Sequence, residues 1–320
     1  MRVNHEKSLF ATWTIVSLVA LTGCGSDAST GIVQIALGAE DTITEGLFAG
    51  TGGEDVIDGW SVDFDAYIVA VGEAQLAGGA DSPVRSDRRL VIDLAQLPPS
   101  GMMLARFDRV ASGLWPEVSF RTFIATEHAE RHASVTQAEF DRMVTEGCTY
   151  LIRGTLTNPS GQRCVRGDSS SCEPATSIGF DVCVPAETAY GPCESDTGIE
   201  GLVVVADATT SANFTIHGDH LFFNGFPSGA EGSVARRAQW LVNADLDANG
   251  EVTRAELEAI GASDLGAMFP STVNDGFPGF SLGNSPIAIE SAWDYVRAQL
   301  KTQGHFQGEG ECGIDSASHD

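Results

Sequence analysis

The chain has 320 residues, of which 42% are apolar, so it is long enough and apolar enough to bury a core. Its 44 Asp and Glu residues outweigh 18 Lys and Arg residues, and the formal net charge is -26. So few basic side chains cannot neutralise a run of phosphates, which excludes a nucleic-acid partner, whereas an acidic surface attracts divalent cations.

The beginning of the chain has the features of an export signal. Two basic residues precede an apolar stretch over 9–21, which is too short to cross a membrane as a helix. Residues 21–24 read Leu-Thr-Gly-Cys and resemble the lipobox of bacterial lipoproteins, where the signal is cut and the new N-terminal Cys is acylated. The resemblance implies a lipid on Cys24. The alternative is an ordinary signal peptide with a chance Cys at this position.

The lipobox resemblance also implies a location. It predicts a signal peptide over 1–23 and a flexible tether over 24–31, which is made of small and polar residues. The mature protein would be anchored by lipid in the cell envelope, at the outer membrane or the cell surface.

Strand patterns dominate the next part of the chain. The segment "GWSVDFDAYIVAVGEAQL" alternates and then runs apolar, as a long strand that passes from half-buried to buried would do. Shorter strand patterns follow in "RRLVIDLAQL", "EVSFRTFIA", "CTYLIRGTLT" and "GLVVVAD". Because helices and strands do not alternate here, we predict a mainly β fold, with an antiparallel β-sandwich over 32–228.

Six cysteines remain after Cys24, and an even number in an exported chain predicts three disulfides. Their pairing is open, because six cysteines allow fifteen connectivities. Five fall within 148–193 and one lies near the C-terminus, so at least one bridge should hold the tail against the middle of the chain. The six are Cys148, Cys164, Cys172, Cys183, Cys193 and Cys312.

Helix signals appear at three places. Thr136 and Glu139 form a capping box that predicts a short helix ending at Gly147. After Ser233 the pattern becomes helical, and a later apolar stripe predicts a helix over 287–303. We therefore predict a small α-helical EF-hand-like module over 229–320 after the sandwich.

The module contains the most specific motif in the chain, "NADLDANGEVTRAELEAI" at 243–260. It resembles the calcium loop of the EF-hand family, with an oxygen donor at every ligand position and Gly250 at the tight turn. Val252 should pair with a second, metal-free loop near Phe280. The predicted calcium ligands are Asp245, Asp247, Asn249, the Glu251 carbonyl, Thr253 and Glu256.

A second metal site is predicted from the segment "FTIHGDHLFF", which brings His217, Asp219 and His220 close together in sequence. Imidazole and carboxylate groups suit copper or zinc. The tail segment "HFQGEGEC" adds His305, with Glu309 and Glu311 as further candidates. The alternative is that these histidines satisfy hydrogen bonds at the end of a strand.

The order of "DGWSVDFDAYIVAVGEAQL", "LWPEVSFRT", "TIHGDHLFF", the calcium loop and "GHFQGEGEC" resembles that of bacterial surface lipoproteins. The first part is similar to the periplasmic copper-associated MbnP-like proteins. The similarity implies a binding role for a metal or a metal complex, and no defined ligand set transfers by position.

These observations predict an exported, lipid-anchored calcium-binding protein with a binding or envelope role, and not an enzyme. Calcium would be a structural cofactor, and the sequence names no protein partner. The first alternative is a periplasmic or surface protein that binds copper or zinc. The second alternative is a secreted hydrolase, because "GFSLG" places Ser281 in a Gly-x-Ser-x-Gly pattern.

Overall fold

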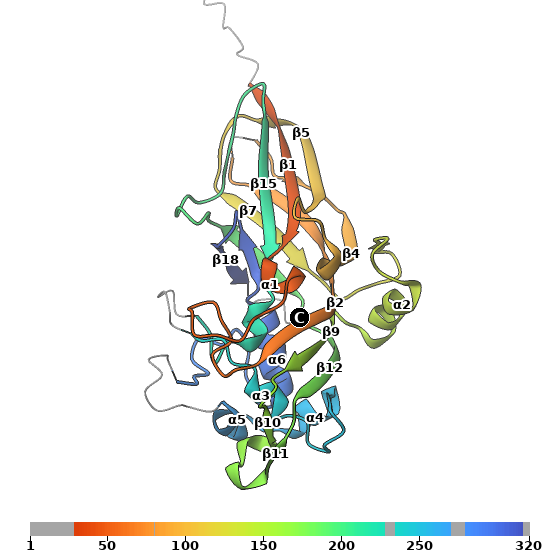
Figure 1. Cartoon of the computed structure of the whole chain (residues 1–320). Coiled ribbons are helices and arrows are strands. Elements are labelled where there is room, and N and C mark those ends of the chain that lie inside the picture. The colour runs from red at the N-terminus through yellow and green to blue at the C-terminus, as the bar shows by residue number, and fades with distance from the viewer. Residues whose placement is uncertain (1–28, 80, 228–233, 270–278, 316–320) are drawn as a thin grey trace, which may run out of the picture.

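The computed structural model describes residues 29–79, 81–227, 234–269 and 279–315 (Figure 1). The predicted signal peptide (1–23), the lipid acceptor Cys24 and residues 25–28 of the predicted tether lie outside this range. The first strand starts at Thr30, within the last residues of that tether. No helix in the described part of the chain has the length and apolar character needed to cross a membrane.

The protein is mainly β, and most of its strands belong to one large curled sheet. The hydrogen-bonded order along this sheet is β16-β12-β9-β2-β7-β13-β18-β17-β15-β1-β5, and β3, β4 and β8 extend it at the side of β2. Its strands are β1 (Thr30–Ala39), β2 (Ser61–Ala77), β3 (Val84–Arg85), β4 (Arg89–Asp93), β5 (Met102–Ala111), β7 (Glu117–Thr122), β8 (Glu130–Arg131), β9 (Tyr150–Thr157), β12 (Ser177–Val184), β13 (Thr188–Cys193), β15 (Thr209–Ile216), β16 (Glu251–Val252), β17 (Gly304–Phe306) and β18 (Gly310–Asp315).

Two small sheets and several short helices complete the fold. One small sheet joins β6 (Gly113–Trp115) to β14 (Leu202–Val204), and the other joins β10 (Gln162–Cys164) to β11 (Cys172–Pro174). The α-helices are α1 (Asp41–Thr44), α2 (Gln137–Glu146), α3 (Gln239–Val242), α4 (Arg254–Ala259), α5 (Ala262–Met268) and α6 (Ala292–Leu300). The 3₁₀ turns are η1 (Leu94–Gln96), η2 (Val165–Gly167), η3 (Ser169–Ser171) and η4 (Asp219–Phe222).

The large sheet is mixed, so the prediction of an antiparallel sandwich is not confirmed. Strand β1 pairs in parallel with β15 on one side and antiparallel with β5 on the other. The pairs β12/β16 and β4/β8 are also parallel. Alternating apolar residues show which side of a strand is buried, and they carry no information about the direction of the neighbouring strand.

Strand β2 confirms the predicted long strand, and it is buried on both faces along its middle. Tyr67 and Val69 face the main core of the molecule. Ile68 and Ala70 point to the opposite face and belong to a second, smaller apolar cluster. Helix α2 covers this second face, which explains why the alternation of the first residues gives way to a continuous apolar run.

Helix α2 begins and ends as its sequence predicts. The Thr136 hydroxyl accepts a hydrogen bond from the Glu139 backbone N–H, and the Glu139 carboxylate accepts one from the Thr136 N–H. Gly147 ends the helix in the left-handed conformation, at a φ of 70°. Phe140 and Met143 are the helix residues buried against the sheet.

The C-terminal part of the chain is less helical than predicted, and the helical EF-hand module is not confirmed. Helix α6 is shorter than the predicted 287–303, because a capping box between Ser291 and Asp294 starts it at Ala292. Helix α3 has four residues. Beyond α6 the chain returns to the large sheet as β17 and β18, next to β15 and β13.

Three disulfides are present, and the prediction that one of them holds the tail is confirmed. Cys193 in β13 is bonded to Cys312 in β18. The other two bridges are Cys148–Cys183, next to the cluster under α2, and Cys164–Cys172, between β10 and β11.

Candidate metal centre

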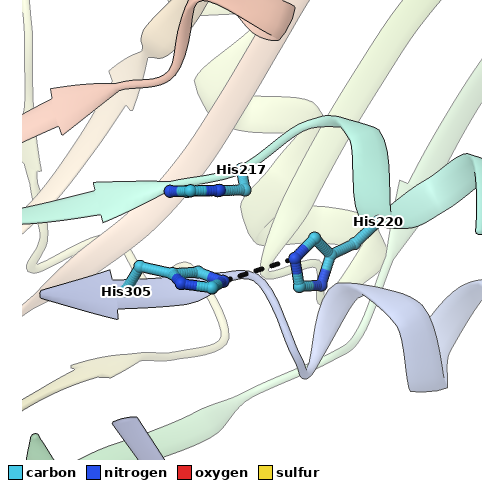
Figure 2. A group of neighbouring side chains, drawn as sticks. All are labelled: His217, His220 and His305. Carbon is cyan, nitrogen blue, oxygen red and sulfur yellow. Dashed lines mark hydrogen bonds between the residues drawn. The ribbon is translucent and has the colours of Figure 1, made fainter. Parts of the chain in front are cut away.

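Three buried histidines meet where the end of β15 lies beside β17 (Figure 2). His217 directly follows β15, His220 is in η4, and His305 is the central residue of β17. The antiparallel pairing of β15 with β17 aligns Thr215 with His305, which brings the tail histidine to the other two. One ring nitrogen from each histidine lies within 4.8 Å of the others. We call these three residues the histidine cluster.

Two of the ring nitrogens already face each other. The distance from His220 Nε2 to His305 Nε2 is 3.3 Å, and the two ring planes are almost perpendicular, at 83°. His217 instead stacks on His305, with ring centroids 3.9 Å apart and an interplanar angle of 20° (Figure 2). His305 Nδ1 is buried and has no hydrogen-bond partner among the described residues.

Thr302 determines which nitrogen of His220 carries the proton. The Thr302 hydroxyl donates to the Gln299 carbonyl oxygen at 2.8 Å, and the hydroxyl oxygen of Thr302 lies 2.8 Å from His220 Nδ1. Because the hydroxyl proton is already used, the Thr302 oxygen accepts from His220 Nδ1–H. In the neutral ring, His220 Nε2 then carries the lone pair, and it accepts the hydrogen bond from His305 Nε2–H.

Burial keeps the histidine cluster neutral. Removal from water lowers the pKa of His220 well below its ordinary value, and the neighbouring His305 and His217 lower it further. Burial is also the main cause that lowers the pKa of His305, to about 3, and that lowers the pKa of His217. Neutral imidazole is the form that binds metal ions, so protons do not compete for these nitrogens near pH 7.

Two carboxyl groups lie on the outer side of His217. His217 Nδ1 is 3.5 Å from Glu40 Oε2 and 3.8 Å from Glu309 Oε2. Burial, followed by the charge of Asp219, raises the pKa of Glu40 to about 8. Glu40 is therefore mostly protonated at pH 7, and it meets His217 as a neutral partner. In metal-binding proteins, a carboxyl group beside the second ring nitrogen of a ligating histidine commonly fixes the orientation of the ring.

Asp219 is turned to a different partner. Its Oδ2 accepts a hydrogen bond from Arg236 Nε at 2.7 Å, and Arg236 Nη2 lies 2.6 Å from the same oxygen. The sequence placed Asp219 with the two nearby histidines as a ligand, and the structure places its carboxylate on this guanidinium. Glu311 lines the nearby cavity, and burial raises the pKa of its carboxyl group.

The histidine cluster opens into a cavity of about 300 Å³. All three imidazoles line it, together with the apolar rings of Phe223 and Phe226. An ion or a small molecule could thus reach ring nitrogens that are otherwise buried.

The predicted calcium loop forms a compact ring of oxygen atoms at the other candidate site. Carboxylate oxygens of Asp245, Asp247 and Glu256 lie within 4.8 Å of one another. Asp245 accepts hydrogen bonds from the N–H groups of Asn249 and Gly250, at 3.2 and 3.1 Å. The remaining predicted ligands lie on the same loop, with Glu251 in β16 and Thr253 as the N-cap of α4.

One detail of the loop differs from expectation. Val252 pairs with Phe180 of β12, so the predicted pairing with a second loop near Phe280 is wrong. The loop is thus joined to the edge of the large sheet through β16. Gly250 has a φ of 85°, and a Cβ there would meet nothing within 4 Å. Glycine is therefore favoured by the backbone angle and not by lack of space.

Ser281 does not lie on the strand-to-helix turn that a hydrolase nucleophile requires. It is exposed, in a segment without regular secondary structure, and its hydroxyl accepts a hydrogen bond from the Gly283 N–H at 3.2 Å. The motif therefore has the residues of a nucleophile elbow without its geometry.

Sequence reasoning missed two residues next to the histidine cluster, Thr302 and Glu40. Thr302 lies just after the end of α6. Its position three residues before His305 was the sequence signal that could have identified it as a neighbour of the cluster. Glu40 follows β1, and only the parallel pairing of β1 with β15 brings it to His217. The comparisons with known proteins find no match, since no family model, no curated protein and no solved structure matches the chain.

Proposed function

We propose that this protein binds a transition-metal ion, copper or zinc, at His217, His220 and His305. The observation that carries the proposal is the pair of Nε2 atoms of His220 and His305, which face each other at 3.3 Å in a buried site. Two nitrogens bound at 2.0–2.1 Å to a tetrahedral ion are about 3.3 Å apart. The two atoms thus already have the separation of two metal ligands.

His217 is the third ligand in this proposal. The lone pair of an imidazole nitrogen points outward in the plane of its ring. Two stacked rings have parallel planes, so their lone pairs cannot meet at one ion, and His217 must turn away from His305 when the ion binds. The cavity beside the ring gives room for this rotation.

The donor set favours copper or zinc over calcium and magnesium, because neutral imidazole is a borderline ligand and hard cations prefer oxygen. This proposal agrees with the binding role implied by the resemblance to MbnP-like proteins.

Metal titration of the purified chain tests the proposal. Wild-type protein, loaded with calcium, should bind one copper or zinc ion with an affinity that falls at least tenfold in His220→Ala and in His305→Ala. His128→Ala is the matched control, because the His128 side chain is 88% exposed and lies outside the cluster. Ultraviolet circular dichroism should show that all variants are folded.

Equal binding by wild type and both cluster variants would contradict the proposal, as would the absence of copper and zinc binding in folded wild-type protein. A shift in the imidazole proton resonances of His217 on metal addition would support the predicted rotation of its ring.

We further propose that the loop over 245–256 binds calcium as a structural ion in an EF-hand-like site. The convergence of the Asp245, Asp247 and Glu256 oxygens supports this role. The ion would tie α4 to the edge of the sheet, since β16 lies inside the loop and pairs with β12. In this proposal, the protein is exported and is anchored in the cell envelope by a lipid on Cys24, and its role is binding and not catalysis.

A further inference from the structure

The end of the molecule where the described chain begins has an exposed apolar surface. Six large apolar side chains are exposed among the described residues, and three of them lie on or directly after the small sheet of β6 and β14. Leu114, Val203 and Val205 are 52%, 53% and 54% exposed. We call these three residues the apolar patch.

The patch is one face of a regular two-stranded sheet. Leu114 pairs directly with Val203, and the neighbouring pair of Trp115 with Leu202 is buried on the opposite face. Val205 shares the direction of Val203, because it lies two residues further along the chain. Neither 113–115 nor 202–205 contains an ionisable side chain, in a protein with a net charge of -26.

The patch surrounds the point at which the chain would leave for its lipid. The Ser112 N–H donates to the Ser29 carbonyl oxygen at 2.8 Å, and the Asp207 N–H donates to the Thr30 carbonyl oxygen at 2.9 Å. Ser112 precedes Leu114 by two residues, and Asp207 follows Val205 by two. Ser29 follows Cys24 by five positions, so the lipidated end can lie at most about 18 Å from this surface.

We infer that the apolar patch rests on the lipid bilayer and sets the orientation of the anchored protein. The inference depends on the proposed lipid anchor. With the anchor in place, the patch is held close to the membrane and meets the bilayer far more often than it meets another protein. Its three side chains can enter the interface, and the two segments that carry them, 113–115 and 202–205, hold no charge that acidic headgroups would repel.

The orientation has a consequence for both metal sites. Figure 1 shows β1 beginning at the end of the molecule that lies opposite α3, α4 and α5. The calcium loop would therefore point away from the membrane, and the histidine cluster would lie between the two ends.

Fluorescence from single labelled positions tests this orientation. The full chain is produced with its own signal, extracted from the envelope and placed in phosphatidylethanolamine and phosphatidylglycerol vesicles. An environment-sensitive fluorophore is attached to Leu114→Cys or to Val203→Cys. The control is Phe48→Cys, since Phe48 is 61% exposed and directly follows Leu47, which pairs with Val62 near the start of β2. At the other end of β2, Ala77 pairs with Glu117, which lies close to the patch in sequence. The distance from Val62 to Ala77 along the strand is roughly 50 Å.

Emission from positions 114 and 203 should shift to shorter wavelength on vesicles and should be quenched by a lipid-borne quencher, while position 48 stays unchanged. Equal behaviour at all three positions would overturn the inference. So would the same blue shift in lipid-free protein together with a doubled molecular mass, because a second copy would then cover the patch.

The mass of the N-terminal peptide separates this inference from the proposed lipidation. If Cys24 carries no lipid, the lipid anchor is wrong, and the same labelled variants are then acylated chemically at the N-terminus. Quenching at 114 and 203 after this step would still support the patch as a membrane contact, and its absence would overturn it.

Discussion

The two candidate metal sites differ in how the chain builds them. The calcium loop uses oxygen donors from one continuous segment, and most of its ligands are partly or fully exposed. The histidine cluster uses nitrogen donors from two distant segments, the end of β15 with η4 and the strand β17, and all three histidines are buried. The first site depends on local turns, whereas the second exists only when β15 and β17 pair.

This difference explains why the two sites should respond to different perturbations. A loop made by local backbone hydrogen bonds keeps most of its shape when distant parts of the protein change. A site assembled from distant strands is lost when the sheet that joins them opens. Each prediction below affects one site more than the other.

The largest effect is expected from the disulfide that holds the tail. Replacing both Cys193 and Cys312 by Ser should lower the free energy of unfolding by about 5 kcal/mol, because the bridge closes a long loop. Since β18 holds β17 in the sheet, copper or zinc binding should weaken strongly while the stabilisation by calcium persists. Urea unfolding with and without each metal measures both effects.

The disulfide between Cys164 and Cys172 provides the matched control. It closes a loop of sequence separation 8, so its removal should cost about 2.5 kcal/mol. It lies beside the calcium site, where Arg163 contacts Asp245 at 3.4 Å. Its loss should reduce calcium binding more than copper or zinc binding. The same response of both metals to both double variants would contradict the separation of the two sites.

Calcium should stabilise the protein by the next largest amount. At a calcium concentration one hundred times the dissociation constant, the free energy of unfolding should rise by about 2.7 kcal/mol. Glu256→Gln should remove this increase, because it removes a charged oxygen ligand. Glu258→Gln is the control, since Glu258 is paired with Arg254 on the surface. Melting temperatures with calcium or with chelator give the measurement, and an identical response of the two variants would argue against the site.

The sequence predicted the parts of the protein that local chemistry determines. The ligand order from Asp245 to Glu256, the capping box of Thr136 and the long strand β2 each depend on neighbours within a few residues or on the period of a strand. The structure has the capping box and the strand as predicted. The pinning of the tail was predictable because Cys312 had only distant partners.

What the sequence could not predict is which strands become neighbours. Apolar periodicity identifies a buried face, but the energy of pairing β1 with β15 and of β12 with β16 comes from contacts between distant segments. For this reason the sequence could group His305 with His217 only because both are residues that bind metals. It gave no reason to include Thr302.

Acid should destabilise the protein through the histidine cluster. His305 has a pKa of about 3 in the folded chain, below the ordinary value of 6.5, so the unfolded chain binds the extra proton first. Its contribution to stability is complete above pH 6.5 and is lost as the pH falls toward 3, by up to about 1.4 kcal/mol for each pH unit. From pH 6.5 to 5 the loss is about 2 kcal/mol.

Glu40 acts in the opposite direction. Its folded pKa of about 8 lies above the ordinary 4.5, so its contribution is complete below pH 4.5 and is lost as the pH rises through 8. Urea unfolding of metal-free protein from pH 5 to 8 should therefore show a flatter acid slope for His305→Asn and a steeper one for Glu40→Gln. His128→Asn should match wild type, because its side chain is exposed. Identical slopes for all four proteins would contradict burial as the cause.

The smallest predicted effect concerns the hydroxyl that orients His220. In Thr302→Val the Nδ1–H of His220 loses its acceptor, so the ring can adopt the other tautomer and turn its lone pair away from His305. The affinity for copper or zinc should fall about tenfold, or about 1.4 kcal/mol, while calcium binding stays unchanged. Thr302→Ser keeps the hydroxyl and should bind metal as wild type does. Because Val also removes the hydroxyl donor to the Gln299 carbonyl, which keeps only the backbone N–H of residue 302 at 3.1 Å, both variants should be compared at equal fractions folded. A loss in the Ser variant without a loss in the Val variant would mean that the methyl group of Thr302, which Val keeps, supports the site, and not its oxygen.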